Sequence, residues 1–322
     1  SGQLDEVRIA VPRSHRLAPP GRAGRPVVRP PGPAPAGRRL LPAYPPAAID
    51  RAAARGRRPC MPVLVHAAHR GVAHALAVRL VAEGGQVRAT ARDGVGALRA
   101  QGVFTAACDP DDEGRIEAAL TQVHTLVVLL GGLGHADVDG VRREGAAVAR
   151  AAAGAAVQRA VVVTLAGSGP GAAEPLRQAH GEIAALFADL PLPTVEVRTG
   201  LIDTPTATDL LLGAGLPEAE RARPVAPVTV DDLVELVVSI DHARSRAAEG
   251  HLVVAADGPA RRTIEEHLVL ASDGTRGRLT GRRVPTAAER AALLATLDGP
   301  WWTDDPLVPD AWTLFDVPVT RA

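Results

Sequence analysis

The sequence of 322 residues contains no lysine and no asparagine, and it has one tyrosine, one methionine and two cysteines. Aromatic residues make up only 2% of it. A nucleic-acid surface needs clustered positive charge with aromatic side chains that stack on bases, so we expect no nucleic-acid partner. Cys60 and Cys108 are too few for a disulfide framework, and without a Cys-x-x-Cys pair they indicate no zinc or dithiol site. We therefore expect no metal.

Long apolar runs are also missing. Segments such as Val161–Leu165 are far too short to span a bilayer, and the N-terminus lacks the apolar core of a secretory signal. The low cysteine content fits a reducing compartment. These absences predict a cytoplasmic protein with no membrane partner.

Residues 1–60 are rich in proline, glycine, alanine and arginine and have no periodic apolar positions. They hold 12 of the 36 basic residues but only three of the 36 acidic ones. This composition predicts a disordered extension. The lone methionine, Met61, stands directly before the first strand, which leaves open whether residues 1–60 belong to the native protein. We expect one domain over residues 61–322, with a C-terminal, substrate-side segment from about residue 256.

From Met61 onward, short β-branched apolar runs alternate with helical stretches rich in alanine and leucine. This alternation predicts an α/β fold, a doubly wound parallel sheet of the Rossmann type. The expected strands are Val63–Val65, Val87–Ala89, Thr125–Leu130, Ala160–Thr164, Thr194–Arg198 and, as a sixth, His251–Ala255. The expected helices are Ala73–Glu83, Ala97–Gln101, Arg115–Thr121, Val138–Ala153, Leu176–Asp189 and Val230–Ile240.

The stretch from Val63 to Asp93 resembles the opening βαβ unit of the atypical or extended short-chain dehydrogenase/reductases, which include NmrA-like proteins. Further matches follow in order: Cys108-Asp109 after the third strand, Val127–Gly132, Arg198-Thr199-Gly200, and Val228 to Asp232. The resemblance covers residues 61 to about 285. It implies a fold that binds NAD(P) at the carboxyl ends of the strands, with the pyrophosphate on a helix N-terminus.

The glycine loop of the family is degenerate here. Its three glycine positions fall on Ala67, Arg70 and Ala73, and only Gly71 remains, displaced by one place. An arginine at the second position would project into the pyrophosphate space or require a positive φ. Arg70 is thus either a replacement phosphate clamp or a side chain that fills a vacant cleft. Dinucleotide binding is predicted to be weak or absent.

The resemblance also implies which residues would hold a cofactor. Arg92 takes the place of a 2′-phosphate-binding arginine, so NADP is expected over NAD if either binds, and Asp109 takes that of the aspartate beside the adenine. The full set of expected cofactor-binding residues is His66, His69, Arg70, Gly71, Arg92, Asp109, Gly131 and Gly132.

The family's catalytic step uses a tyrosine with a lysine four residues later, and a serine that polarises the carbonyl. At the family spacing the tyrosine falls on Leu176 and the lysine on His180, while the serine falls near Thr164 or Leu165, with Ser168 nearby. No alignment restores the pair, because the chain has no lysine and its one tyrosine, Tyr44, lies outside the domain. The candidate catalytic residues are His180, Thr164 and His135.

Other side chains allow more than one interpretation. His66, His69 and His74 could bind an anion or a metal, act in acid/base catalysis, or form a polar surface loop. Trp301-Trp302, Trp312 and Phe315 are expected to dock as an apolar clasp or to cover the substrate. His267, beside two glutamates, is expected on an exposed helix face.

Three hypotheses about function remain. The first is a dehydrogenase-like protein without the catalytic pair. It would be a pseudoenzyme with a small-molecule-binding or regulatory role, or it would catalyse a non-redox reaction. The second is an NADP-dependent oxidoreductase or isomerase that works without the tyrosine. The third is a cyclase, dehydratase or epimerase that uses histidine as acid and base. A small-molecule ligand is expected in each case, and a homo-oligomer is possible.

Overall fold

The computed structural model describes residues 61–69, 71–131, 137–243, 250–275, 285–297 and 307–317. The predictions for residues 1–60, Arg70, Gly132, His135 and Trp301-Trp302 lie outside these ranges. None of the helices within them is long and apolar enough to cross a membrane.

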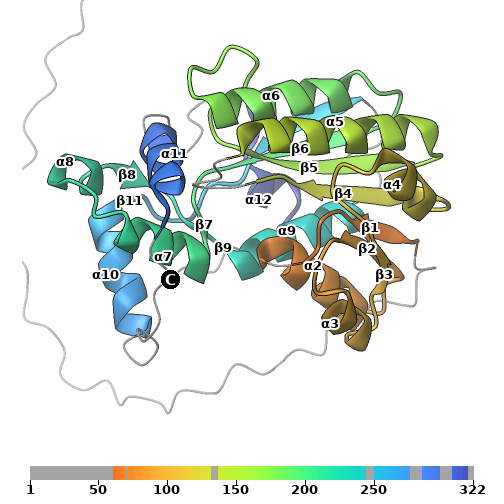
Figure 1. Ribbon diagram of the computed structural model, residues 1–322, viewed down its shortest axis with the longest axis horizontal. Helices are drawn as coiled ribbons and strands as arrows, with labels where there is room; N and C mark the ends of the chain where they lie inside the picture. The colour runs from red at the N-terminus through yellow and green to blue at the C-terminus, as the bar shows by residue number, and fades with distance from the viewer. Residues whose placement is uncertain are drawn as a thin grey trace, which may run out of the picture. The chain divides into compact units, whose positions relative to one another are not determined.

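A seven-stranded parallel sheet in the order β10-β6-β5-β4-β1-β2-β3 forms the centre of the described chain (Figure 1). The predicted Rossmann-type architecture is confirmed. The sequence analysis predicted residue ranges for six of these strands and none for β3. β3 is an edge strand in which one residue is buried and the others are exposed or partly exposed. The strands are β1 (Val63–Val65), β2 (Val87–Ala91), β3 (Phe104–Ala107), β4 (Thr125–Leu129), β5 (Arg159–Leu165), β6 (Thr194–Thr199) and β10 (His251–Ala255).

Helices cover both faces of this sheet (Figure 1). On one face lie α4 (Glu113–Leu120), α5 (Val138–Gly154) and α6 (Pro175–Ala188); on the other lie α2 (Gly71–Ala82), α3 (Val95–Ala100) and α9 (Val230–His242). Asp112, Asp137 and Thr229 each accept a backbone N–H from the first turn of α4, α5 and α9, so side-chain caps fix where these helices begin.

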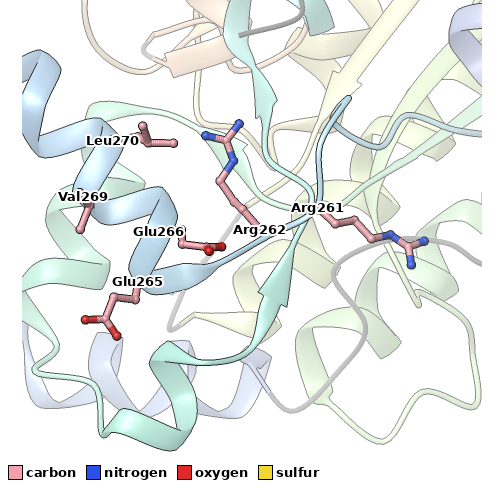
Figure 2. Close-up of a pocket in the computed structure, with 6 residues that line it drawn as sticks. All are labelled: Arg261, Arg262, Glu265, Glu266, Val269 and Leu270. Atoms are coloured by element: carbon pink, nitrogen blue, oxygen red, sulfur yellow. The ribbon is translucent and has the colours of Figure 1, made fainter. Parts of the chain in front are cut away.

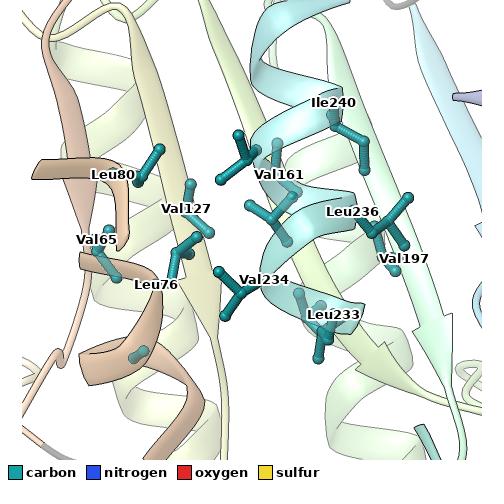
Figure 3. Close-up of a cluster of buried hydrophobic side chains, with 14 of the residues drawn as sticks. Val65, Leu76, Leu80, Val127, Val161, Val197, Leu233, Val234, Leu236 and Ile240 are labelled. Atoms are coloured by element: carbon teal, nitrogen blue, oxygen red, sulfur yellow. The ribbon is translucent and has the colours of Figure 1, made fainter. Parts of the chain in front are cut away.

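The core is divided by the sheet because successive strand side chains point to opposite faces. Val63 and Val65 of β1 pack in the cluster under α2 and α9, whereas Leu64 packs in the cluster under α4, α5 and α6. Figure 3 shows the first cluster, in which leucines of α2 and α9 meet valines of the central strands.

A smaller region follows β6. It contains β7 (Ile202–Asp203), α7 (Pro205–Gly213), α8 (Glu218–Arg221), β8 (Pro224–Val225), β9 (Val228–Thr229), β11 (Arg262–Thr263), α10 (Ile264–Thr275) and α11 (Ala287–Leu297). β7 pairs with β9, β8 pairs with β11, and a third apolar cluster joins α7, α10 and α11.

The last described segment packs on the main body, as predicted for Trp312 and Phe315. Both side chains are buried in the cluster of α2 and α9, and the indole N–H of Trp312 donates to the carbonyl of Asp257 at 2.8 Å. α12 (Ala311–Leu314) follows a bridge between Asp310 and Ala255 of β10. This segment therefore runs beside the β10 end of the sheet.

Candidate functional site

The residues predicted from the family resemblance follow the carboxyl ends of adjacent strands. His66 follows β1, Arg92 follows β2, Asp109 lies just beyond β3, and Gly131 lies just beyond β4. The strand order changes direction between β1 and β4, and open α/β sheets bind ligands beside such a switch point. The topology thus brings these positions to one edge of the sheet.

The loop after β1 is held by a network of buried side chains. Nε2 of His66 lies 3.1 Å from Oε1 of Glu144, and Nδ1 lies 2.9 Å from Oγ1 of Thr90. A carboxylate can only accept, so Nε2 carries the proton, and in neutral His66 Nδ1 accepts the Thr90 hydroxyl. His66 and Thr90 are buried. His66 is therefore a structural link between β1, β2 and α5 and not part of an exposed polar loop.

The same network sets the turn that a glycine makes in the family. Ala67 has φ 51°, and its N–H donates to Oγ1 of Thr90 at 3.0 Å. The N–H of Ala68 donates to the carbonyl of Thr90, and that of His69 donates to the carbonyl of Ala67. Three backbone donors of the loop are thus used within the protein. Alanine holds the left-handed conformation itself, at a cost of about 1 kcal/mol.

α2 begins at Gly71, which has φ 66°. A Cβ added there would meet no atom within 4 Å other than those of its two chain neighbours. The first N–H groups of a helix lack intrahelical partners and attract phosphate. The resemblance expects the cofactor pyrophosphate at this helix start, and three backbone donors of the loop before it are used within the protein.

Arg92 and Asp109 are paired at the ends of β2 and β3. Nε of Arg92 lies 3.0 Å from Oδ1 of Asp109, and the two side chains are 60% and 67% exposed. Exposed ion pairs contribute at most about 1 kcal/mol, so a ligand phosphate can separate this one at little cost. The structure thus joins the two residues that the resemblance assigned to the adenosine end of the cofactor.

The positions expected for the tyrosine and lysine lie on α6. Leu176 is buried in the cluster under α4, α5 and α6, and Nε2 of His180 donates to the carbonyl of Gly131 at 2.8 Å. His180 therefore ties α6 to the end of β4. Its imidazole is buried, and this ring nitrogen is occupied by a backbone acceptor.

Thr164, at the position expected for the serine, belongs to an ionic cluster. Its hydroxyl donates to Oε1 of Glu196 at 3.0 Å, and Glu196 also bonds Arg198 at 2.8 Å and lies 3.4 Å from His251. Burial disfavours ionisation of Glu196, but hydrogen bonds from His251, Arg198 and Thr164 and the charge of Arg198 outweigh it and lower its pKa to about 2. Thr164 thus points its proton at a carboxylate of the protein.

The sequence interpretation missed Arg177, which is buried beside Leu176. Its Nε donates to the carbonyl of Ala166 at 2.8 Å, and its Nη1 donates to the carbonyl of Thr296, near the end of α11, at 2.9 Å. Burial lowers the pKa of Arg177, and the charge of Glu174 opposes this effect. Its position in the helical pattern does not distinguish an inward from an outward arginine, so no sequence signal identified it.

His267 corrects the prediction of an exposed helix face. It is 3% exposed, and its Nε2 lies 3.7 Å from Oδ1 of Asp203. Burial lowers the pKa of His267, the charge of Asp203 raises it, and the charge of Arg262 lowers it. The neighbouring glutamates misled the prediction because they occupy the outer positions of the same helix turn.

A surface hollow of about 540 Å³ lies along α10 and is lined by Arg261, Arg262, Glu265, Glu266, Val269 and Leu270 (Figure 2). It includes none of the residues predicted for the cofactor or for catalysis. Glu265 pairs with Arg221, and Glu266 accepts the N–H of Thr263. The hollow is open, and these side chains are explained by the start of the helix, so we do not assign it to the site.

No family model matches the sequence, and no curated protein matches it. Solved structures do match the fold. A triphenylmethane reductase of Citrobacter sp. complexed with NADP(H) aligns with a TM-score of 0.62 and 19% identity, over 81% of this chain and 96% of that one. A nucleoside-diphosphate-sugar epimerase of Staphylococcus aureus aligns with a TM-score of 0.59 and 13% identity, over 81% and 98%.

A UDP-glucuronic acid 4-epimerase variant of Bacillus cereus, in complex with a fluorinated UDP-sugar and NAD, aligns with a TM-score of 0.59 and 12% identity, over 81% of this chain and 95% of that one. At these identities the likeness shows a shared fold. The Rossmann-type fold that the resemblance to the extended short-chain dehydrogenase/reductases implied is thus confirmed.

Proposed function

We propose that this protein binds NADP(H) at the carboxyl edge of its sheet and carries out no acid/base step with the side chains at the family's catalytic positions. Such a protein serves as a cofactor-binding or ligand-binding protein. The observation that carries the proposal is that the described side chains expected to move protons are each bonded within the protein: Thr164 to Glu196, His180 to Gly131, and His66 to Thr90 and Glu144.

The cofactor part of the proposal rests on the two ends of the dinucleotide site. It is supported by α2, which begins at Gly71 after β1, where the resemblance expects the pyrophosphate, and by Arg92 at the end of β2, where it expects a 2′-phosphate. A guanidinium binds a phosphate through charge-assisted hydrogen bonds, which NAD(H) cannot offer at this position. The backbone N–H groups of residues 67–69 donate to Thr90 and Ala67 and not to a ligand. We therefore expect weaker dinucleotide binding than in a protein with a glycine loop.

Titration calorimetry of the parent with NADPH, NADP, NADH and NAD tests this proposal. We expect Arg92→Ala to weaken NADPH binding about tenfold, which corresponds to 1.4 kcal/mol, and to leave NADH binding unchanged. Arg143→Ala, which removes an arginine of similar exposure from α5, is the matched control. Failure of all four dinucleotides to bind, or an equal loss for NADPH and NADH in Arg92→Ala, would contradict the proposal.

A second candidate function is the reduction of an acceptor that needs no proton. The observation in its favour is the fold shared with the Citrobacter triphenylmethane reductase. Bound NADPH supplies a hydride, and a triarylmethyl cation that accepts it at the central carbon becomes neutral, with NADP left as the oxidised product. No tyrosine or lysine is required for this balance.

This second function is tested by following dye decolourisation together with NADPH consumption. We expect one NADPH consumed per dye, a rate insensitive to pH across the range in which histidine titrates, and no turnover of ketones. A rate that follows a histidine titration would favour the third hypothesis, acid/base catalysis, for which His66 and His180 are poorly placed because each is already bonded.

A further inference from the structure

The outer edge of β3 carries a set of side-chain contacts, and of its residues Val103 and Thr105 are buried whereas Ala107 is exposed. A sheet edge presents unpaired backbone groups, and another strand can add to them. At the β10 end of the sheet, the N–H of Ala255 donates to the carbonyl of Pro309 in the C-terminal segment, so part of that edge is already paired. The β3 end has no such segment among the described residues.

The direction of each backbone group in β3 follows from one hydrogen bond. The N–H of Cys108 donates to the carbonyl of Ala91 in β2, so Cys108 points its backbone groups inward. Backbone groups of successive residues in a strand alternate in direction. Those of Val103, Thr105 and Ala107 therefore point outward, away from the sheet.

All three outward carbonyls accept a hydrogen bond from a side chain. Nη2 of Arg99 donates to the carbonyl of Thr105 at 2.9 Å, and Nη1 of Arg115 donates to that of Ala107 at 2.8 Å. The hydroxyl of Thr105 donates to the carbonyl of Val103 at 3.2 Å. The two arginines come from α3 and α4, and Arg115 also pairs with Asp112, its Nε lying 3.4 Å from Oδ2.

We propose that Arg99 and Arg115 close the outer edge of β3 against strand addition by a second copy of this chain. Phe104 lies beside the same edge and is 73% exposed. Burial of its side chain in an edge-to-edge dimer would favour association. Two copies that meet edge to edge would have to break the hydrogen bonds that Arg99 and Arg115 donate to the strand carbonyls. Any homo-oligomer of this chain then forms through other surfaces.

The test compares Arg99→Ala/Arg115→Ala with Arg143→Ala/Arg150→Ala. The second pair removes the same charge from exposed arginines of α5. These arginines pair with acidic side chains, as Arg115 does with Asp112, so the control matches the loss of charge and of an ion pair. Light scattering over a range of concentrations should show self-association at least about tenfold tighter in the edge variant than in the control. The amides of Thr105 and Ala107 should exchange more slowly in the associated form, because they become paired.

Addition of Ala107→Pro to Arg99→Ala/Arg115→Ala distinguishes association by strand pairing from nonspecific association. The N–H of Ala107 points outward, so proline removes an edge donor without a loss of bonding to β2. We expect this triple variant to return to the parental state of association. If the double variant fails to fold, the single variants, each of which opens one carbonyl, are measured in the same way. Association equal to that of the control, or association that survives Ala107→Pro, would overturn the proposal.

Discussion

The contact between α6 and the loop after β5 allows a quantitative prediction. A Cβ added at Gly181 would lie 2.3 Å from Cα and C of Gly169 and 2.5 Å from its N. These are backbone atoms, so no rotamer change can relieve the overlap. The helix and the loop must separate if Gly181 is replaced by alanine.

Two opposing effects set the size of the change. Alanine is better than glycine within a helix by about 1 kcal/mol, and overpacking of a closely packed contact costs about 1–3 kcal/mol. Because backbone cannot yield as a side chain does, we expect the upper part of that range and a net loss of about 1–2 kcal/mol for Gly181→Ala. The displaced loop includes Ala166, whose carbonyl accepts a hydrogen bond from Arg177, so this hydrogen bond should weaken as well.

Gly114→Ala is the matched control because Gly114 also lies in a helix and its nearest atom, Oδ1 of Asp112, is 3.9 Å away. Urea unfolding should show Gly114→Ala up to about 1 kcal/mol more stable than the parent and Gly181→Ala less stable. Gly145→Ala provides a comparison in which the added Cβ meets a side chain: Cδ1, Cγ1 and Cγ2 of Ile183 lie at 2.4, 2.5 and 2.9 Å. Ile183→Ala removes all three atoms, so the double variant should lose less stability than the sum of the two single variants. Stabilisation by Gly181→Ala would refute the reasoning.

Two further predictions concern the site. Ala67→Gly should stabilise the fold by about 1 kcal/mol, because Ala67 has φ 51°, and should raise the melting temperature by a few degrees; a fall would show that the turn does not adopt this conformation. The pKa of Glu196 is lowered from 4.5 to about 2, so its ionised form stabilises the fold by on the order of 3 kcal/mol above pH 4.5, and this contribution is lost as the pH falls towards 2. In unfolding measured over a series of acid pH values, Glu196→Gln should remove this part of the pH dependence of the unfolding free energy.

The strands were predictable from the sequence because a parallel sheet covered on both faces requires continuous β-branched runs, as in Val161–Val163. β3 has one buried residue between exposed or partly exposed ones, and this pattern gives a weak signal. The positions at the carboxyl edge were predictable for the same reason as the strands: Arg92 and Asp109 follow strand ends, so the topology alone brings them together.

The environment of the histidines was not predictable from the sequence. Buried His66 forms hydrogen bonds with Glu144 and Thr90, which lie 78 and 24 residues away in the chain. The sequence around His66 does not indicate either contact. His267 was misjudged because its neighbours are acidic, although its own position on α10 faces Asp203. A polar side chain between charged residues can lie on either side of a helix, and only the packing of the other elements decides which.

The hydrogen bonds of Thr164 and His180, together with the missing tyrosine, support the proposal that this edge of the sheet binds a ligand without acid/base catalysis. A general acid or base must exchange its proton with a substrate within about 3 Å. Nε2 of His180 donates a hydrogen bond to the carbonyl of Gly131, and the hydroxyl of Thr164 donates one to Glu196, whose pKa is lowered to about 2. Use of either group would first require its bond to break. Binding, or hydride transfer that needs no proton, requires no such rearrangement, and this difference is why the proposed function is built on Arg92 and the start of α2.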